Sequence, residues 1–210
     1  FEVEIEGCKI IKHHSYKQKV IYAEFNETGT LSFQFQSSTL GNTFDIDWGD
    51  GTISGVSIGT SFTTVNHNYT KTGKKIIKLI APCFDNIIGF KVFKNIGVLD
   101  FSQFPNLSEL RYDNAPTANW YFSGCTKLYD FMFTSSGVTS FNIGLQKELQ
   151  FFLLDDTGIT SDELDKLLLM FWKYRKVNKY QVQLNFFNLG YSASAYFMSI
   201  YNGTGDFAGE

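Results

Sequence analysis

The sequence has few of the residues on which small catalytic and metal-binding sites depend, with three cysteines, three histidines and three methionines among 210 residues. Cys8, Cys83 and Cys125 are odd in number, far apart and without C-x-x-C spacing, so neither a disulfide framework nor a zinc site is expected. No H-E-x-x-H or G-x-S-x-G motif is present, and no Gly-rich phosphate loop leads from a strand into a helix. We therefore predict that the chain is not an enzyme and binds no cofactor.

Charge and hydropathy argue against two further classes of function. The 18 basic and 21 acidic residues leave a net charge of −3, and no dense stripe of Lys and Arg is available to neutralise phosphates. Nucleic acid is therefore not an expected partner. No run of about 18 apolar residues exists, so we expect no membrane span in this chain. The sequence does not begin with Met, so removal of a leader or a preceding domain is compatible with it, and the lack of a signal peptide does not indicate the cytoplasm.

Aromatic residues are abundant, with 22 Phe and 11 Tyr, whereas Pro occurs only three times. Together with turn residues at short intervals, this composition favours β structure. Alternation of apolar and polar residues predicts seven strands, at residues 1–6, 20–25, 31–36, 44–47, 53–58, 62–65 and 75–81. Seven short strands are typical of an immunoglobulin-like β-sandwich.

The stretch Trp48-Gly49-Asp50-Gly51-Thr52 follows one of these strands and predicts a tight turn. The two glycines permit positive φ angles on either side of Asp50, whose carboxylate can accept backbone N–H bonds within the turn. Trp48 is large enough to anchor a small core. We expect the first half of the chain to be organised around this turn.

Residues downstream of the turn extend the motif. His67-x-Tyr69 is followed by Gly73 and by the alternating run Ile77-x-Leu79-x-Ala81. With W-G-D-G, these residues resemble a PKD domain, which is an immunoglobulin-like β-sandwich. The resemblance implies structural roles for the residues that carry it: Trp48, Asp50, His67 and the corner tyrosine Tyr69. One position departs from the family pattern, because Lys75 stands where an aromatic residue is usual.

Asp45, Asp47 and Asp50 allow a second interpretation of the same region. Asp45 and Asp47 share one face of a strand, and Ca²⁺ binds carboxylate oxygens, so the three residues are a weak candidate for a calcium site. Alternatively, the first two form the polar face of a half-buried strand, and Asp50 holds its turn. The PKD resemblance implies this second role, and we predict no metal.

After Pro82 the periodicity changes. The pattern Phe101-Ser102-x-x-x-x-Leu107-x-x-Leu110-x-Tyr112 recurs 21 residues later as Phe122-Ser123-x-x-x-x-Leu128-x-x-Phe131-x-Phe133. A third copy, Leu149-x-x-Phe152-x-Leu154, follows after another 21 residues. In such repeats each unit is a short strand with a return segment, and its apolar edge is buried only by stacking on its neighbours. We therefore expect Leu107, Leu128 and Leu149 to be buried and stacked in one row.

This segment resembles the irregular, Phe-rich leucine-rich repeats in surface proteins of gut Bacteroidetes and their phages. The position usually held by Asn is occupied here by Ala115, Ser136 and Thr157, so the asparagine ladder of that family is missing.

The repeats are followed by helix signals. Thr160 and Glu163 form a capping box, which predicts a helix to about Arg175. Its apolar face holds Leu164, Leu167, Leu168 and Phe171. A strand is expected at residues 181–187, where Leu184 and Phe186 repeat the L-x-L spacing. We interpret this helix and strand as the unit that closes the end of the repeats.

Candidate contact residues lie in the repeat loops. Because loops on a rigid scaffold tolerate variation, we expect contacts at residues 115–121 and around Ser135 and Ser136. Trp120 and Tyr121 are the predicted centre, since large aromatic rings with a polar edge dominate binding hot spots. The alternative is that Trp120 belongs to the core, enclosed by Phe122 and Leu128. A role in stacking on sugars is also open for these two rings and for Trp172-x-Tyr174.

Together, these patterns predict a mainly β protein of two domains. Residues 1–82 are expected to form a PKD-like sandwich, and residues 83–210 a short leucine-rich-repeat solenoid with a C-terminal capping helix. The two resemblances imply a non-catalytic, extracellular binding, adhesion or assembly protein on a cell surface or a virion, with a protein or a surface glycan as partner. The alternative is a carbohydrate-binding accessory module of a larger polysaccharide-degrading enzyme.

Overall fold

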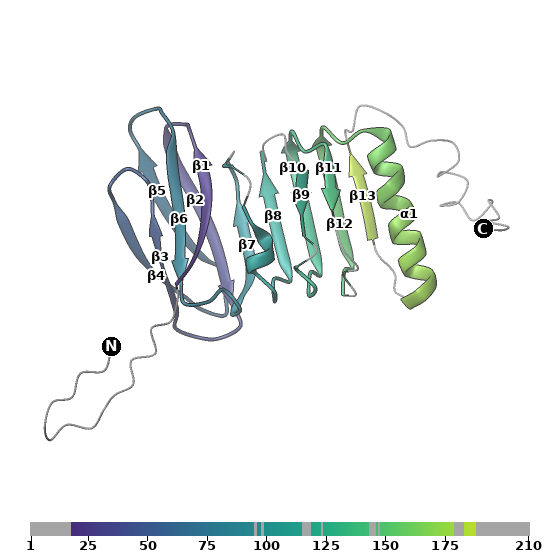
Figure 1. The fold of residues 1–210 in the computed structure, drawn as a ribbon, viewed down its shortest axis with the longest axis horizontal. Helices are drawn as coiled ribbons and strands as arrows, with labels where there is room; N and C mark the ends of the chain where they lie inside the picture. Colours follow the sequence, from purple (N-terminus) through teal and green to yellow (C-terminus); the bar gives the residue numbers. More distant parts are fainter. Residues whose placement is uncertain are drawn as a thin grey trace, which may run out of the picture.

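The structure is a computed structural model, which describes residues 18–94, 96–97, 99–114, 119–122, 124–142, 146, 148–178 and 183–187 (Figure 1). At residues 119, 135–136, 141–142, 172–178 and 183–187 only the backbone is described. The strand expected at residues 1–6, together with Cys8 and Ala115, lies outside the described residues.

The protein is mainly β, as predicted, with one α-helix near its C-terminal end. The sandwich strands are β1 (Lys19–Phe25), β2 (Gly29–Ser37), β3 (Asn42–Asp47), β4 (Ile53–Ile58), β5 (Thr63–Tyr69), β6 (Lys75–Ala81) and β7 (Ile87–Val92). The remaining elements are the 3-10 helix η1 (Phe101–Gln103), β8 (Glu109–Asp113), β9 (Asn119–Tyr121), β10 (Asp130–Ser136), β11 (Ser140–Asn142), β12 (Phe151–Thr157), α1 (Ser161–Asn178) and β13 (Gln183–Phe187).

The N-terminal half is a sandwich of two packed sheets. One sheet has four antiparallel strands in the order β1-β6-β3-β4. It packs on the antiparallel strands β5, β2 and β7 of a second sheet. The six strands predicted between residues 20 and 81 are all present, and β5 extends four residues beyond its expected end at Val65. The strands alternate buried and exposed residues because one face of each sheet is in the core.

The second sheet continues beyond the sandwich. Its strand order is β13-β12-β10-β8-β7-β2-β5, and Figure 1 shows the parallel strands standing side by side up to the helix. β7 is the junction, because it pairs antiparallel with β2 and parallel with β8. The expected domain boundary at residue 82 lies between β6 and β7, so one sheet runs across it. Independent folding of residues 1–82 stays a prediction.

The inner face of this long sheet carries two continuous rows of large apolar residues. In strand order the first row is Phe35, Phe90, Leu110, Phe131 and Phe152, and the second is Phe33, Val92, Tyr112, Phe133 and Leu154. All ten residues are buried. Rings contact from strand to strand, with centroids 5.2 Å apart for Phe35 and Phe90 and 4.8 Å apart for Phe131 and Phe152. The two halves of the chain therefore share one hydrophobic core.

The period of 21 residues corresponds to the spacing of adjacent parallel strands. Asp130 pairs with Glu109 and with Phe151, each 21 positions away. Leu107, Leu128 and Leu149 are buried, as predicted. Each of them donates its backbone N–H to the carbonyl three residues earlier, so the turns before the strands are alike. These turns stack through the bonds Tyr129 N–H to Ser108 O and Gln150 N–H to Tyr129 O.

Hydrogen bonds from side chains in these turns also link successive repeats. Cys125 Sγ lies 3.2 Å from the carbonyl oxygen of Phe101, and Gln146 Nε2 donates to the carbonyl of Phe122 at 2.7 Å. Both residues are buried and lie 24 positions after their acceptors. Burial, with a smaller contribution from Asp100, raises the pKa of the Cys125 thiol to about 12. Cys125 thus serves as a buried hydrogen-bonding group. The hydroxyl of Thr157 is buried and has no hydrogen-bond partner among the described residues.

The helix α1 closes the end of the core opposite the sandwich. The N–H of Glu163 donates to Thr160 Oγ1 at 3.3 Å, which is one half of the predicted capping box, while the Glu163 carboxylate pairs with Lys166 at 2.5 Å. Phe171 packs edge-on against Phe152, with centroids 5.1 Å apart. β13 then pairs parallel with β12, and Leu184 lies opposite Phe152. None of the helices in the described part of the chain combines the length and the apolar character needed to cross a membrane.

Replacement of Phe90 by Ala tests whether the two halves share one core. Phe90 contacts Phe33 and Phe35 of the sandwich and Phe101 and Phe104 of the repeats, so its loss is expected to cost about 3–5 kcal/mol of unfolding free energy. Urea denaturation followed by NMR amide signals should show both halves losing stability in one transition. Tyr22→Ala, at a side chain that is 56% exposed, is the control. Two separate transitions, of which Phe90→Ala shifts only one, would contradict a shared core.

Candidate functional site

The turn between β3 and β4 requires glycine at two positions. Gly49 and Gly51 have φ angles of 74° and 94°, in the left-handed region that other residues rarely adopt. A Cβ atom on Gly49 would also lie 2.5 Å from the backbone oxygen of Ile76. Trp48 N–H donates to Thr52 O at 3.0 Å and closes the turn. The turn therefore fits against β6 only with glycine at position 49.

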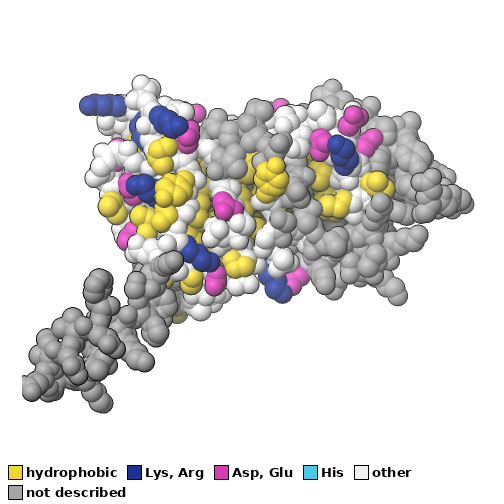
Figure 2. All heavy atoms as spheres, in the orientation of Figure 1, with side chains coloured by type: hydrophobic (Ala, Val, Ile, Leu, Met, Phe, Trp, Pro, Cys, Tyr) yellow, Lys and Arg dark blue, Asp and Glu magenta, His cyan; other side chains and the backbone are white. Residues whose placement is uncertain are grey.

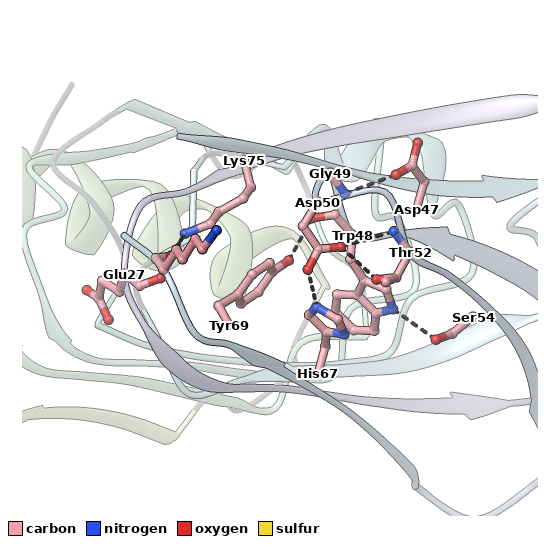
Figure 3. Close-up of polar contacts among 11 residues, drawn as sticks. Glu27, Asp47, Trp48, Gly49, Asp50, Thr52, Ser54, His67, Tyr69 and Lys75 are labelled. Atoms are coloured by element: carbon pink, nitrogen blue, oxygen red, sulfur yellow. Dashed lines mark hydrogen bonds and ion pairs between the residues drawn. The ribbon is translucent and has the colours of Figure 1, made fainter. Parts of the chain in front are cut away.

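Asp50 organises the turn through both carboxylate oxygens (Figure 3). Its Oδ1 accepts hydrogen bonds from the N–H and the hydroxyl of Thr52, at 3.1 and 2.6 Å, and its Oδ2 lies 2.7 Å from His67 Nε2. The hydroxyl bond from Thr52, followed by the contact with His67, lowers the pKa of Asp50 from 3.8 to about 2. The carboxylate is thus held in its charged form as a structural acceptor.

Trp48 connects this turn to the core. Its indole ring is fully buried and lies against the His67 ring, at 4.7 Å and 13°, and against Phe33, at 5.8 Å and 17°. The indole N–H donates to Ser54 Oγ at 2.9 Å. The Tyr69 hydroxyl donates to the Trp48 carbonyl at 2.8 Å, and burial raises the pKa of this tyrosine. All of these polar groups have partners inside the protein, so the side chains around the turn are held in one arrangement.

Lys75, where the sequence departs from the predicted pattern, is buried, and its ammonium group has partners inside the sandwich. The residue is 8% exposed, and its ammonium lies 4.9 Å from the ring centroid of Tyr69 and 5.8 Å from that of Phe25. The ammonium also donates to the carbonyls of Lys71 and Glu27, at 2.5 and 3.2 Å. The methylene groups of Lys75 make apolar contacts, while two backbone carbonyls and the faces of two aromatic rings stabilise its charge.

The calcium interpretation of the three aspartates has no support in the structure. Asp47 accepts hydrogen bonds from Lys78 Nζ at 2.7 Å and from Gly49 N–H at 2.9 Å, and the Lys78 bond is the main cause of its lowered pKa. Asp50 is engaged with Thr52 and His67. Among the described residues, no group of three or more His, Cys, Asp or Glu is placed to hold a metal ion.

The structure places the two predicted contact residues, Trp120 and Tyr121, in different environments. Trp120 is fully buried and packs against Phe122, Tyr112 and Phe133, with centroids at 6.2, 4.9 and 5.3 Å. Because its ring belongs to the core, Trp120 does not form a contact surface, which corrects that part of the prediction. The next residue of β9 faces the opposite way, and Tyr121 is 59% exposed. Of this pair, only Tyr121 remains a candidate for contact.

The other predicted contact residues lie on regular elements. Ser135 and Ser136 are at the end of β10 rather than in a loop. Trp172 and Tyr174 are on α1, where their side chains are outside the description. Residues 115–118 of the expected contact loop are also outside it.

Sequence reasoning missed two features of the long sheet. The first is that β7 begins the repeats: Ile87-x-x-Phe90-x-Val92 precedes Leu107-x-x-Leu110-x-Tyr112 by 20 residues. The second is a charged band on the solvent side of β7 and β8. Lys91 pairs with Glu109, and Arg111 with Asp113 at 3.2 Å. The alternation Glu109-x-Arg111-x-Asp113 was the available signal, because it places all three side chains on one face of a strand.

No protein-family model, curated protein or solved structure matches this chain. The roles given to these residues therefore depend on their geometry.

Replacement of Trp48 by Ala tests whether this side chain anchors the turn between β3 and β4 to the core. The change removes the contacts with His67 and Phe33 and leaves the Ser54 hydroxyl without its donor, so we expect a loss of about 3–5 kcal/mol in unfolding free energy. Chemical denaturation measures it, with Tyr121→Ala as an exposed aromatic control. A Trp48→Ala protein as stable as the unmodified chain would show that the turn is not an anchor.

Asp50 predicts a dependence of stability on pH. Its pKa is about 2 in the folded protein against an ordinary 3.8, so the unfolded chain takes up the proton more readily. The stabilisation is complete above the ordinary pKa and is lost as the pH falls through the folded value. Urea denaturation between pH 5 and about 2 should therefore show a steeper loss of stability in the unmodified protein than in Asp50→Asn. Asp45→Asn, on the exposed face of β3, is the matched control, and equal slopes for all three proteins would refute the assignment.

Proposed function

We propose that this protein is a non-catalytic binding or assembly protein that acts outside the cell or on a virion. In this proposal residues from β1 to β7 form a PKD-like immunoglobulin sandwich, and the parallel strands that follow form a short leucine-rich-repeat solenoid. The turn around Trp48, with its bonds from Thr52 and Tyr69, supports the first assignment. The spacing of 20 or 21 residues between paired parallel strands supports the second.

The observation that carries the proposal is the continuous seven-stranded sheet with one buried core. Such a sheet holds the loops of both halves at fixed distances, because neither half can rotate without breaking the pairing of β7 with β2 and β8. A rigid scaffold of this kind suits recognition through exposed side chains, since less conformational entropy is lost on binding.

Tyr121 is the residue we propose at the centre of the contact. Its backbone is fixed by the pairing of β9 with β11, and the buried Trp120 beside it prevents rotation of the strand. The exposed phenol ring offers an apolar face and a polar hydroxyl, which suit a protein partner. The same ring could stack on a pyranose, and this supports the alternative of a carbohydrate-binding accessory module.

The proposal is tested with the intact protein on a glycan array and on a panel of bacterial surface proteins and polysaccharides. Tyr121→Ala is expected to weaken the strongest interaction by roughly 30-fold, the effect of a hot-spot truncation of about 2 kcal/mol. Tyr22→Ala removes a tyrosine that is similarly exposed, at 56%, and should leave binding unchanged. Both variants are first checked for an unchanged circular dichroism spectrum.

Equal binding by Tyr121→Ala and the unmodified protein would remove Tyr121 from the contact. Turnover of any polysaccharide by the purified chain would overturn the non-catalytic assignment. Binding restricted to one class of glycan would favour the accessory-module alternative over a protein partner.

A further inference from the structure

One face of the seven-stranded sheet is covered by no strand or helix of the described residues, although the ring of Phe62, from the loop before β5, lies over Gly89 and Lys91 of β7. The four-stranded sheet, the small sheet β9-β11 and α1 pack on its inner side, against the two apolar rows. On the other side, which we name the outer face, the described part of the chain places no strand or helix. The residues of this face on four adjacent strands are Lys91 on β7, Glu109 and Arg111 on β8, Asp130 and Met132 on β10, and Phe151 and Leu153 on β12.

The outer face is ordered in two parallel rows. Glu109, Asp130 and Phe151 are directly paired across their strands and form one row. Lys91, Arg111, Met132 and Leu153 form the other. The two rows are therefore one side-chain step apart along the strands, about 7 Å. On β8 this step separates an acidic from a basic residue, and on β12 it separates two apolar residues.

We propose that the outer face binds a second copy of this chain, face to face, across a two-fold axis. The axis lies in the plane of contact, runs across the strands and passes midway between the two rows. Rotation about it places Glu109 opposite Arg111 of the second copy, and Arg111 opposite its Glu109. Phe151 meets Leu153 of the second copy in the same way. A two-fold contact uses each complementary pair twice, which is why a surface with this alternation is self-complementary.

The charge balance of the outer face supports a partner that contributes arginine. On β7, β8 and β10 this face carries the carboxylates of Glu109, Asp113 and Asp130 against the cationic groups of Lys91 and Arg111. The pKa of Asp130 is raised, first by burial and then by the neighbouring Glu109. In the two-fold arrangement Asp130 lies opposite Met132 and beside Arg111 of the second copy, because β8 and β10 are neighbours. The Arg111 side chain is 41% exposed, and within its own chain the guanidinium pairs with Asp113 and lies 5.3 Å from the centroid of the Phe93 ring.

The size of the face suits a weak, reversible dimer. The four strands β7, β8, β10 and β12 span three spacings, or about 14 Å, and strands of five to seven residues are about 17–24 Å long. The projected area is on the order of 300 Å², which places the contact at the small end of specific interfaces, below the ~800 Å² per partner of a typical stable one. Two such faces would pack as aligned sheets about 10 Å apart.

The test uses two charge reversals, Glu109→Arg and Arg111→Glu, in the full chain. Each one places like charges in both symmetry-related pairs, so sedimentation equilibrium should show dimerisation weakened by at least about 100-fold relative to the unmodified dimer. An equimolar mixture of the two variants restores opposite charges in both pairs and should form a heterodimer. A merely destabilised fold would not give this rescue, and circular dichroism of each variant checks the fold separately.

The matched controls reverse a surface ion pair on the other sheet. Glu24→Arg and Lys74→Glu break the pair between β1 and the residue before β6 and should leave the dimer unchanged. Leu153→Arg should abolish dimerisation, because it places a charge in the apolar part of the outer face. An unmodified chain that stays monomeric at ~100 µM, or a mixture of the two reversals that stays monomeric, would overturn the proposal. The outcome is independent of the proposed function, because Tyr121 lies on β9, in a different sheet.

Discussion

The structure depends on the register of the long sheet. Two rows of aromatic and branched side chains must remain aligned over β2, β7, β8, β10 and β12 so that all of them point into one core. A slip of one residue in any of these strands would turn its apolar side chains to solvent, because the side-chain period of a strand is two. The register of β7 is the most constrained, because this strand pairs with an antiparallel neighbour on one side and a parallel neighbour on the other.

Three large buried side chains with polar groups support this register through hydrogen bonds. The hydroxyl of Tyr69 and the indole of Trp48 have hydrogen-bond partners within the sandwich. The hydroxyl of Tyr112 donates to the carbonyl of Ile96 at 2.8 Å, in the segment that leads from β7 into the repeats. Each of these groups would be costly to bury without its partner, so the bonds favour one arrangement of the chain over alternatives of similar apolar burial.

Within the described residues, the long sheet is covered by strands and a helix on one side and by none on the other, which gives the molecule two surfaces with different chemistry. The covered side is bounded by β9, which presents Tyr121, and by the four-stranded sheet, on which Figure 2 shows hydrophobic side chains among charged ones. The open side carries a charged band next to an apolar strip. A dimer through the open side would leave the Tyr121 surfaces of both copies free, so that one assembly could engage two partners or two sites on one polymer.

The sequence by itself determined the local structure: six sandwich strands, the glycine turn at Asp50, the period of 21 residues and the helix start at Thr160. These follow from interactions between residues close in sequence, or from repetition, which a single chain reveals directly. Only the tertiary structure decided that β7 joins the sandwich to the repeats, that Trp120 is buried while Tyr121 is exposed, and that Lys75 lies over Tyr69 and Phe25. Each of these depends on contacts between residues distant in sequence, and alternation along a strand does not say which of its two faces meets the core.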